Sequence, residues 1–216
     1  GLPVHGELID EPRGEVVTAS RAGIAHSLSL RRLWVRTIRH YCASTTVTEP
    51  KSPLKRTAQS PKFKLYQSDT GMLMARYPQP TAQAAYLDDS SPNLGAIYEN
   101  VIAQELTAQG IPLYYYMAKK HGEVDFIADT NADSVMPFEV KSGRSYRTHA
   151  AIDAVLANAE YRISQGVVLS RSNIAQDGGT TYLPLYATYC LRDVCNLASP
   201  STVSTIGDFS LTVHPV

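Results

Sequence analysis

The chain has 216 residues, of which 44% are hydrophobic and 19% charged, and its formal net charge is zero. These values are ordinary for a soluble globular protein and fit one sizeable domain, with or without a small appendage. They exclude a membrane-spanning protein, because no apolar run approaches the roughly 20 residues that a spanning helix needs.

The start of the chain and its thiols predict a cytoplasmic location. The first residues, GLPVHGELIDEP, lack the basic and apolar regions of a signal peptide. Cys42, Cys190 and Cys195 are an odd number of cysteines without paired metal-ligand spacing, so we expect reduced thiols.

Residues 1–60 are predicted to form a basic N-terminal segment, separate from a domain over 61–216. Residues 1–64 contain 11 lysines and arginines against 5 acidic residues, whereas 65–216 contain 9 against 15. Within the segment we expect a loose start over 1–21, a helix over 22–42 and a Ser/Thr/Pro/Lys-rich linker over 43–60. Such charge clustering fits contact with nucleic acid, or a basic linker exposed to solvent, which is the commoner case.

The middle of the chain begins with a strand and two helices. Residues 62–69 alternate and predict a strand, and Asp69 caps a short helix in DTGMLMARY that PQPTAQ then breaks. The strongest helix pattern is 91–110, with Ser91 as N-cap, Pro92 at the first position and Gly110 as the C-terminal stop. Its apolar stripe comprises Leu94, Ile97, Tyr98, Val101, Ile102 and Leu106.

The second half predicts an α/β fold in which helices flank a mixed central sheet. Strands are expected over 111–118, 122–129 and 134–142, and their short connections favour an antiparallel meander. A helix over 145–160 then crosses to a strand over 166–172 that runs parallel to the third. A last short strand and a helix occupy 182–197, followed by a Ser/Thr-rich tail.

Charged residues inside two predicted strands point to a site. By alternation, Glu123, Asp125 and Ile127 share one face of 122–129, and Glu139 and Lys141 share one face of 134–142. If the strands pair in register, Asp125 and Glu139 converge while the opposite faces build a core.

Two converging carboxylates need a shared cation, and Mg²⁺ (or Mn²⁺) suits oxygen ligands. We expect Asp125 and Glu139 as ligands, the Val140 carbonyl as a third, and Glu99 from the preceding helix as a direct or water-mediated fourth. Lys141 would orient or deprotonate the attacking water and stabilise the developing anion. Glu123 either replaces Asp125 or pairs with Lys119 or Lys120, and the second alternative is favoured.

A basic and aromatic rim is expected beside this site. Phosphate contacts are predicted for Lys119, Lys120, Arg144 and Arg147, with Tyr146 as a stacking surface. The alternative is an ordinary solvated loop rim.

The ordered motifs resemble a known superfamily. Glu99 on a helix, then Asp125, then Glu139-Val140-Lys141, on a helix–three strands–helix–strand scaffold, resembles the PD-(D/E)xK nucleases, which include restriction endonucleases and archaeal Holliday junction resolvases. The resemblance implies a restriction endonuclease-like core, metal ligation by Asp125 and Glu139 with support from Glu99, and a catalytic role for Lys141.

A narrower resemblance covers roughly residues 50–197. YQSDTGML, YENVIAQEL, YYYMAKKHGEVDFI and PFEVKSG are similar to the C-terminal domain of unknown function that follows the ATPase module in many prokaryotic AAA-type ATPases. This implies an ATPase partner in cis or in trans and makes residues 1–60 a remnant of the connecting region. The chain itself has no GxxxxGK[ST] phosphate loop.

Two functions follow as hypotheses. The first is a Mg²⁺-dependent nuclease that hydrolyses DNA phosphodiester bonds. The second is a catalytically inactive DNA- or protein-interaction module of an ATPase, in which the charged residues form a structural ion-pair cluster.

Overall fold

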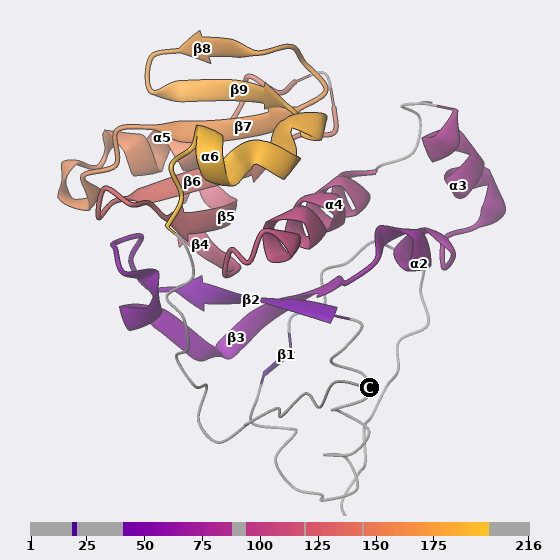
Figure 1. Cartoon of the computed structure of the whole chain (residues 1–216), viewed down its shortest axis with the longest axis horizontal. Coiled ribbons are helices and arrows are strands. Elements are labelled where there is room, and N and C mark those ends of the chain that lie inside the picture. The colour runs from indigo at the N-terminus through magenta and orange to yellow at the C-terminus, as the bar shows by residue number, and fades with distance from the viewer. Residues whose placement is uncertain (1–18, 21–40, 88–93, 119, 144, 199–216) are drawn as a thin grey trace, which may run out of the picture.

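A nine-stranded mixed sheet forms the centre of the computed structural model (Figure 1). The structure describes residues 19–20, 41–87, 94–118, 120–143 and 145–198. The strand order is β1-β3-β2-β4-β5-β6-β7-β9-β8. The strands are β1 (Ala19–Ser20), β2 (Tyr41–Val47), β3 (Ala58–Gln67), β4 (Tyr114–Ala118), β5 (Gly122–Asp129), β6 (Val135–Val140), β7 (Gly166–Ser170), β8 (Ala175–Asp177) and β9 (Thr180–Pro184).

The predicted meander and crossover are confirmed. Strands β4, β5 and β6 pair antiparallel in sequence order, and β7 then pairs parallel to β6. Strand β2 is parallel to β4, and β9 is parallel to β7. Six strands therefore run in one direction, so their carboxyl ends meet at the same edge of the sheet: β1, β2, β4, β6, β7 and β9.

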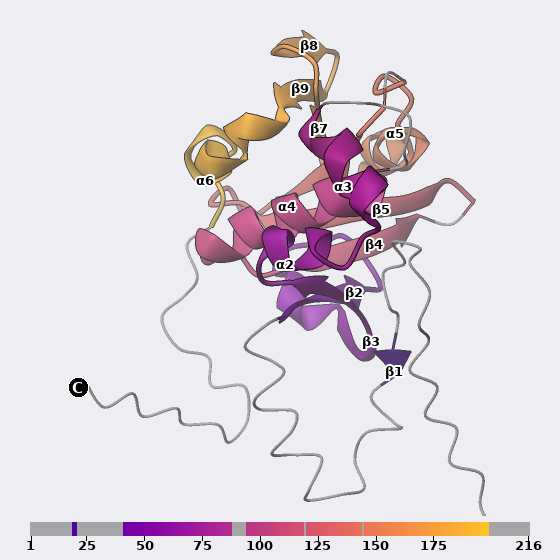
Figure 2. The ribbon, with the colours of Figure 1, turned by 90° about the vertical axis from the view of Figure 1, so that its right-hand side faces the viewer.

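Helices cover both faces of the sheet, as the fold class predicted (Figure 2). One face carries α4 (Gly95–Ala108), the 3-10 helix η4 (Leu185–Cys190) and α6 (Leu191–Val194). The other carries α5 (Ala150–Ala157) and the 3-10 helix η3 (Ala159–Tyr161). We call these the α4 face and the α5 face.

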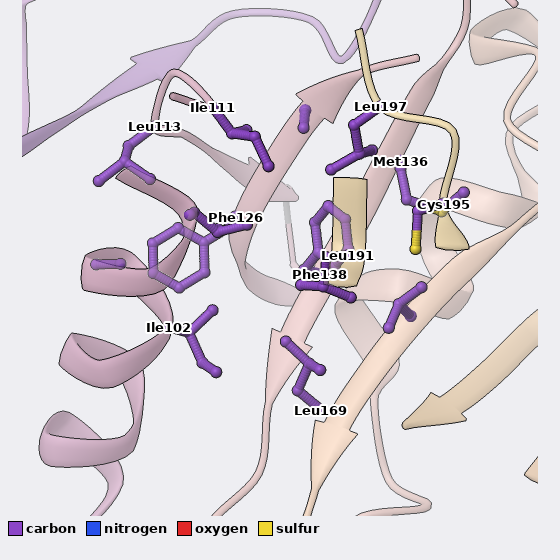
Figure 3. Packing of buried hydrophobic residues seen from close by; sticks show 14 of the residues in the cluster. Ile102, Ile111, Leu113, Phe126, Met136, Phe138, Leu169, Leu191, Cys195 and Leu197 are labelled. Carbon is purple, nitrogen blue, oxygen red and sulfur yellow. The ribbon is translucent and has the colours of Figure 1, made fainter. Parts of the chain in front are cut away.

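Each face buries its own apolar cluster. On the α4 face, Ile102 of α4 lies beside Phe126, and Leu191 of α6 lies beside Phe138 (Figure 3). On the α5 face, Val124 and Ile127 pack with residues of α5 such as Val155. Apolar side chains thus leave the central strands on both sides, as expected for a sheet with two helical layers.

The linker predicted over 43–60 is wrong. This stretch contains most of β2, the 3-10 helix η2 (Leu54–Arg56) and the start of β3. Leu54 is fully buried, and β2 lies between β3 and β4. The β-branched residues in STTV favour a strand, although the surrounding Ser, Thr and Pro suggested a linker. Of the helix predicted over 22–42, residues 22–40 lie outside the described residues, and Tyr41 and Cys42 belong to β2.

Helix α2 (Thr70–Met74) confirms the predicted cap, because the Asp69 side chain accepts a hydrogen bond from the Met72 amide. The predicted break is confirmed, since α2 ends at Met74 before PQPTAQ, but a second helix that was not predicted, α3 (Gln79–Tyr86), begins inside PQPTAQ with a proline in its first turn. Helix α4 begins at Gly95, with Leu94 in the N-cap position, and the predicted cap Ser91 and first-position Pro92 lie outside the described residues.

The remaining corrections concern element ends. Helix α5 begins at Ala150, five residues later than predicted, and β8 was not predicted at all. The tail from 199 onward lies outside the described residues. Within the described ranges, no helix has the length and apolar character needed to cross a membrane.

Candidate functional site

A β-bulge in β5 places the site's carboxylates. Tyr114 pairs with Ile127 and Tyr116 with Val124, so three steps along β5 match two steps along β4. Asp125 and Phe126 therefore both lie opposite Tyr115. An extra residue of this kind shifts the alternation by one position. Glu123, Asp125 and Phe126 consequently belong to the α4 face, whereas Ile127 joins Val124 on the α5 face, which corrects the predicted grouping of Ile127 with the carboxylates.

Helix α4 is fixed against β3 by one buried amide. Asn100 Oδ1 accepts a hydrogen bond from the Gln67 amide at 2.7 Å, and Asn100 Nδ2 donates to the Gln67 carbonyl at 3.0 Å. The same Nδ2 is 3.0 Å from Thr70 Oγ1. Because Glu99 precedes Asn100, this anchor determines where the Glu99 carboxylate lies relative to β3.

Glu99, Glu123 and Asp125 form a carboxylate cluster. Each offers an oxygen, and these atoms all lie within 4.8 Å of one another. All three residues are partly buried. The sequence predicted the approach of Glu99 to Asp125. It did not predict Glu123 as a third member.

A lysine of β3 lies inside this cluster. Lys64 Nζ is 3.0 Å from Glu99 Oε1 and also contacts Glu123 Oε1. Its ammonium is 5.1 Å from the centre of the Tyr115 ring. Tyr66, two residues further on the same face of β3, donates a hydrogen bond to Glu99 Oε1. Glu123 therefore pairs with Lys64; of the two predicted partners, Lys120 forms no ion pair with it within the described residues, and Lys119 lies outside them.

These contacts shift the pKa values of the groups involved. Burial lowers the pKa of the Lys64 ammonium, but Glu99 and Glu123 outweigh this and the net direction is upward. Burial raises the pKa of Glu123 although Lys64 opposes the shift. Burial and the Glu99 charge raise the pKa of the Tyr66 hydroxyl. Lys64 is thus a cation, and Tyr66 a neutral donor, at neutral pH.

Asp125 lies where β5 and β6 stop pairing. The ladder between them ends at Phe126 and Phe138. Beyond it, Asp125 Oδ2 accepts a hydrogen bond from the Val140 amide at 2.7 Å. Burial and the neighbouring Glu99 charge hold the pKa of Asp125 well above its usual range, and the Val140 amide only partly offsets this.

Glu139 and Lys141 form an ion pair outside the carboxylate cluster. Lys141 Nζ is 2.6 Å from Glu139 Oε1. Glu139 pairs in register with Val168, which packs against Ile152 of α5, so Glu139 belongs to the α5 face. Its Oε2 is buried and has no hydrogen-bond partner among the described residues. The Glu139 charge still raises the pKa of Asp125. The two carboxylates do not converge as predicted, because the bulge in β5 turns Asp125 to the α4 face while Glu139 stays on the α5 face.

Part of the predicted rim forms a stacked group. The Tyr146 ring packs edge-on against Tyr182, with centroids 5.6 Å apart. The Arg147 guanidinium lies 5.7 Å from the Tyr146 ring and 5.2 Å from the Tyr182 ring, and 3.7 Å from the Asp177 carboxylate. Lys120 is exposed in a left-handed turn with φ of 66°. Lys119 and Arg144 lie outside the described residues.

A buried histidine lies behind this stacked group. His149 Nε2 is 2.7 Å from the Tyr182 hydroxyl, and Nδ1 is 2.9 Å from Asp153 Oδ1. His149 also precedes the first residue of α5. The Tyr182 ring under Arg147 is therefore held by a hydrogen bond from the start of α5, and the group is part of the folded sheet.

Sequence reasoning missed Lys64 and Tyr66, although a signal was present. KFKLY places a lysine and a tyrosine two positions apart, on one face of a predicted strand. The alternation of residues in this strand could not show which of its two faces packs against α4. That depends on the positions of β2 and β3 in the sheet.

Comparison with known proteins gives one match. The family model described as Domain of unknown function (DUF4143) matches residues 94–188. The matched stretch runs from the start of α4 into η4, and includes Glu99, Glu123, Asp125, Glu139 and Lys141 but not Lys64. No match was found among curated proteins or among solved structures. The class defined so far is therefore an α/β domain similar to a family of unknown function.

Proposed function

We propose that this chain is a Mg²⁺-dependent nuclease of the PD-(D/E)xK type that hydrolyses phosphodiester bonds in DNA. The observation that carries the proposal is the carboxylate cluster of Glu99, Glu123 and Asp125, with oxygens within 4.8 Å, at the point where two central strands separate. Strand ends that separate over a cluster of charged side chains are typical places for a ligand in α/β sheets.

The donor set fits a hard divalent cation. Lys64, Tyr66 and Val140 use Glu99 Oε1, Glu123 Oε1 and Asp125 Oδ2. The second oxygen of each carboxylate takes no part in these bonds. A bound cation would favour the ionised form of all three carboxylates, and together with the Lys64 ammonium they would then leave two negative charges for one Mg²⁺ or Mn²⁺ to balance. Glu99, Glu123 and Asp125 would hold the ion, and the Val140 carbonyl remains a proposed fourth ligand.

A divalent cation bound there supplies Lewis-acid chemistry, since it makes water more acidic and offsets charge on a phosphoryl oxygen. Lys141 supplies a positive charge of its own: its side chain is 30% exposed, and Glu139, 9% exposed, fixes its ammonium. The Lys141 ammonium can therefore meet a phosphate oxygen or orient water. Arg147, with its guanidinium held over two rings, is suited to a DNA phosphate.

A catalytically inactive interaction module is the second candidate, and one observation favours it. Lys64 pairs with two of the three carboxylates, while Glu139 faces the opposite side of the sheet from Glu123. Ion pairs of this kind are also found as purely structural clusters. In that case we expect the domain to serve an AAA-type ATPase in cis or in trans, as the motif resemblance implies.

Metal titration combined with DNA cleavage tests the proposal. Wild type, Asp125→Ala, Glu139→Ala and Lys141→Ala are titrated with Mg²⁺ and Mn²⁺ by calorimetry and assayed on duplex and branched DNA. Asp125→Ala should abolish metal binding, because it removes a direct ligand. Lys141→Ala should bind metal but cleave at least ~100-fold more slowly, because it loses a charge that stabilises the transition state.

Glu160→Ala is the matched control, since it removes an exposed carboxylate of η3 away from the cluster. Its metal affinity and cleavage should equal those of the wild type. If the wild type neither binds millimolar metal nor cleaves DNA, the nuclease proposal fails and the interaction module is retained. Glu139→Ala tests the role of the α5-face carboxylate: normal cleavage by this variant would remove Glu139 from the site.

A further inference from the structure

The carboxylate cluster contains a cation that belongs to the chain itself. Lys64 is 4% exposed, and its ammonium contacts one oxygen each of Glu99 and Glu123. Surface lysines exchange such partners freely, but a buried ammonium depends on them, because leaving water without compensation is strongly unfavourable. The space between the Glu99 and Glu123 carboxylates therefore favours a positively charged group.

The rest of the Lys64 environment holds the ammonium there. The Tyr115 ring lies 5.1 Å from Nζ, at a distance suited to a cation–π contact. Tyr66 donates to the Glu99 oxygen that Lys64 also uses, so that oxygen is oriented toward β3. Lys64 thus has a fixed position next to the oxygens that a metal would use.

A second polar group beside Lys64 has no partner. Ser44 of β2 is directly opposite Lys64 in the antiparallel pair, so the two side chains share a face of the sheet. Ser44 is fully buried, and its Oγ makes no hydrogen bond within the described part of the chain. Buried hydroxyls normally have partners. This unpartnered oxygen on the Lys64 side of the sheet is a second sign, independent of the carboxylates, that a polar ligand is accommodated next to Lys64.

We propose that Lys64 is a built-in competitor of the divalent cation: its ammonium holds Glu99 and Glu123 together when no metal is bound, and its charge limits the metal affinity of the cluster. The inference rests on the proposed metal site and concerns its regulation. A divalent cation at the remaining oxygens is repelled by the ammonium across a few ångströms of partly buried space. Replacing Lys64 with a neutral side chain removes that repulsion and leaves three carboxylates for the metal.

The test is calorimetric titration of Mg²⁺ and Mn²⁺ into wild type, Lys64→Gln and Lys62→Gln, without DNA, at one ionic strength. Lys64→Gln should bind Mn²⁺ about tenfold more tightly than the wild type, or better, because a neighbouring positive charge is lost. Lys62→Gln makes the same chemical change at an exposed position two residues away on β3 and should leave the affinity unchanged. Metal-free Lys64→Gln should also melt at a lower temperature than the wild type, and Mn²⁺ should reverse this loss.

A double variant covers the case in which Lys64→Gln does not fold without metal. Lys64→Gln combined with Glu123→Gln removes one charge of each sign, so it should fold in the absence of metal. Because it also removes a proposed ligand, it should bind Mn²⁺ no more tightly than the wild type. A tenfold gain in this double variant would overturn the charge argument.

The outcomes separate this inference from the proposed function. Equal affinities of wild type and Lys64→Gln would overturn the role of Lys64 and leave the metal site standing. If Lys64→Gln binds Mn²⁺ and the wild type does not, the role of Lys64 is supported. The proposed function is then contradicted, because in the native chain the Lys64 ammonium takes the place of the metal. Absence of binding in both proteins would overturn both.

Discussion

At the scale of single residues, burial decides the chemistry of the thiols. Cys195 is buried in the cluster on the α4 face, beside Leu191 and Leu197. Burial raises the pKa of its thiol to about 12, and the nearby Cys190 adds to the shift. The folded protein therefore holds the Cys195 proton far more tightly than the unfolded chain, where a thiol titrates near ~8.5.

Alkaline conditions should consequently destabilise the protein through Cys195. Because the pKa of the folded state is raised, the contribution of this thiol is fully present below about pH 8.5 and is lost progressively as the pH rises toward 12. Urea unfolding at pH 8 and at pH 10.5 measures it: Cys195→Ala should lose less stability between the two values than the wild type does. Cys42→Ala, a change of the same kind at a partly buried position, serves as control. Equal losses in wild type and Cys195→Ala would contradict the prediction.

At the scale of elements, the segment between β2 and β3 is tied to the far end of β5. Both oxygens of Asp129 accept hydrogen bonds from the Leu54 amide, at 3.1 and 3.2 Å. Leu54 itself is fully buried and packs in the α5-face cluster with Val124 and Ile127. Although η2 is only three residues long, it therefore closes one end of the core.

Truncation of the Leu54 side chain should therefore lower the stability of the protein. Leu54→Ala removes a fully buried side chain and leaves a cavity, so we expect a loss of about 3 kcal/mol in the free energy of unfolding. Leu87→Ala removes the same atoms from a side chain that is 74% exposed and should change stability by less than about 0.5 kcal/mol. Chemical denaturation of both variants measures the difference, and similar losses would show that Leu54 is not part of the core.

The sequence predicted those elements whose pattern is local, and it missed features that depend on pairing with a distant strand. Strands β4, β5, β6 and β7 follow from local alternation and β-branched content, and helix α4 follows from its apolar stripe and Gly110, which adopts a φ of 70°. The bulge at Asp125 could not be predicted, because it exists only relative to β4. Its effect on the site is large, since it moves Asp125 toward Glu99 and leaves Glu139 on the opposite face.

At the scale of the whole molecule, residues far apart in sequence supply the site. Lys64 and Tyr66 come from β3, Glu99 from α4, and Glu123 and Asp125 from β5. The sequence indicated the carboxylates through their unusual position in apolar strands. It did not indicate that Lys64 is their cation. Residues 43–60 have the composition of a linker, so the sequence offered no sign that β2 pairs with both β3 and β4 and thereby places β3 in the sheet.

The central position of β2 determines which parts of the chain can exist alone. A chain shortened to start at residue 61, where the sequence suggested a domain boundary, would lose β2 and leave the backbone of β4 unpaired on one side. Such an open edge recruits strands of other molecules. We expect this shortened chain to self-associate in light scattering while a chain starting at residue 41 remains monodisperse. Equal behaviour of the two would show that the sheet tolerates the gap. Any biochemical study that isolates this domain therefore needs its first sheet strands, although they precede residues 94–188, which the family model matches.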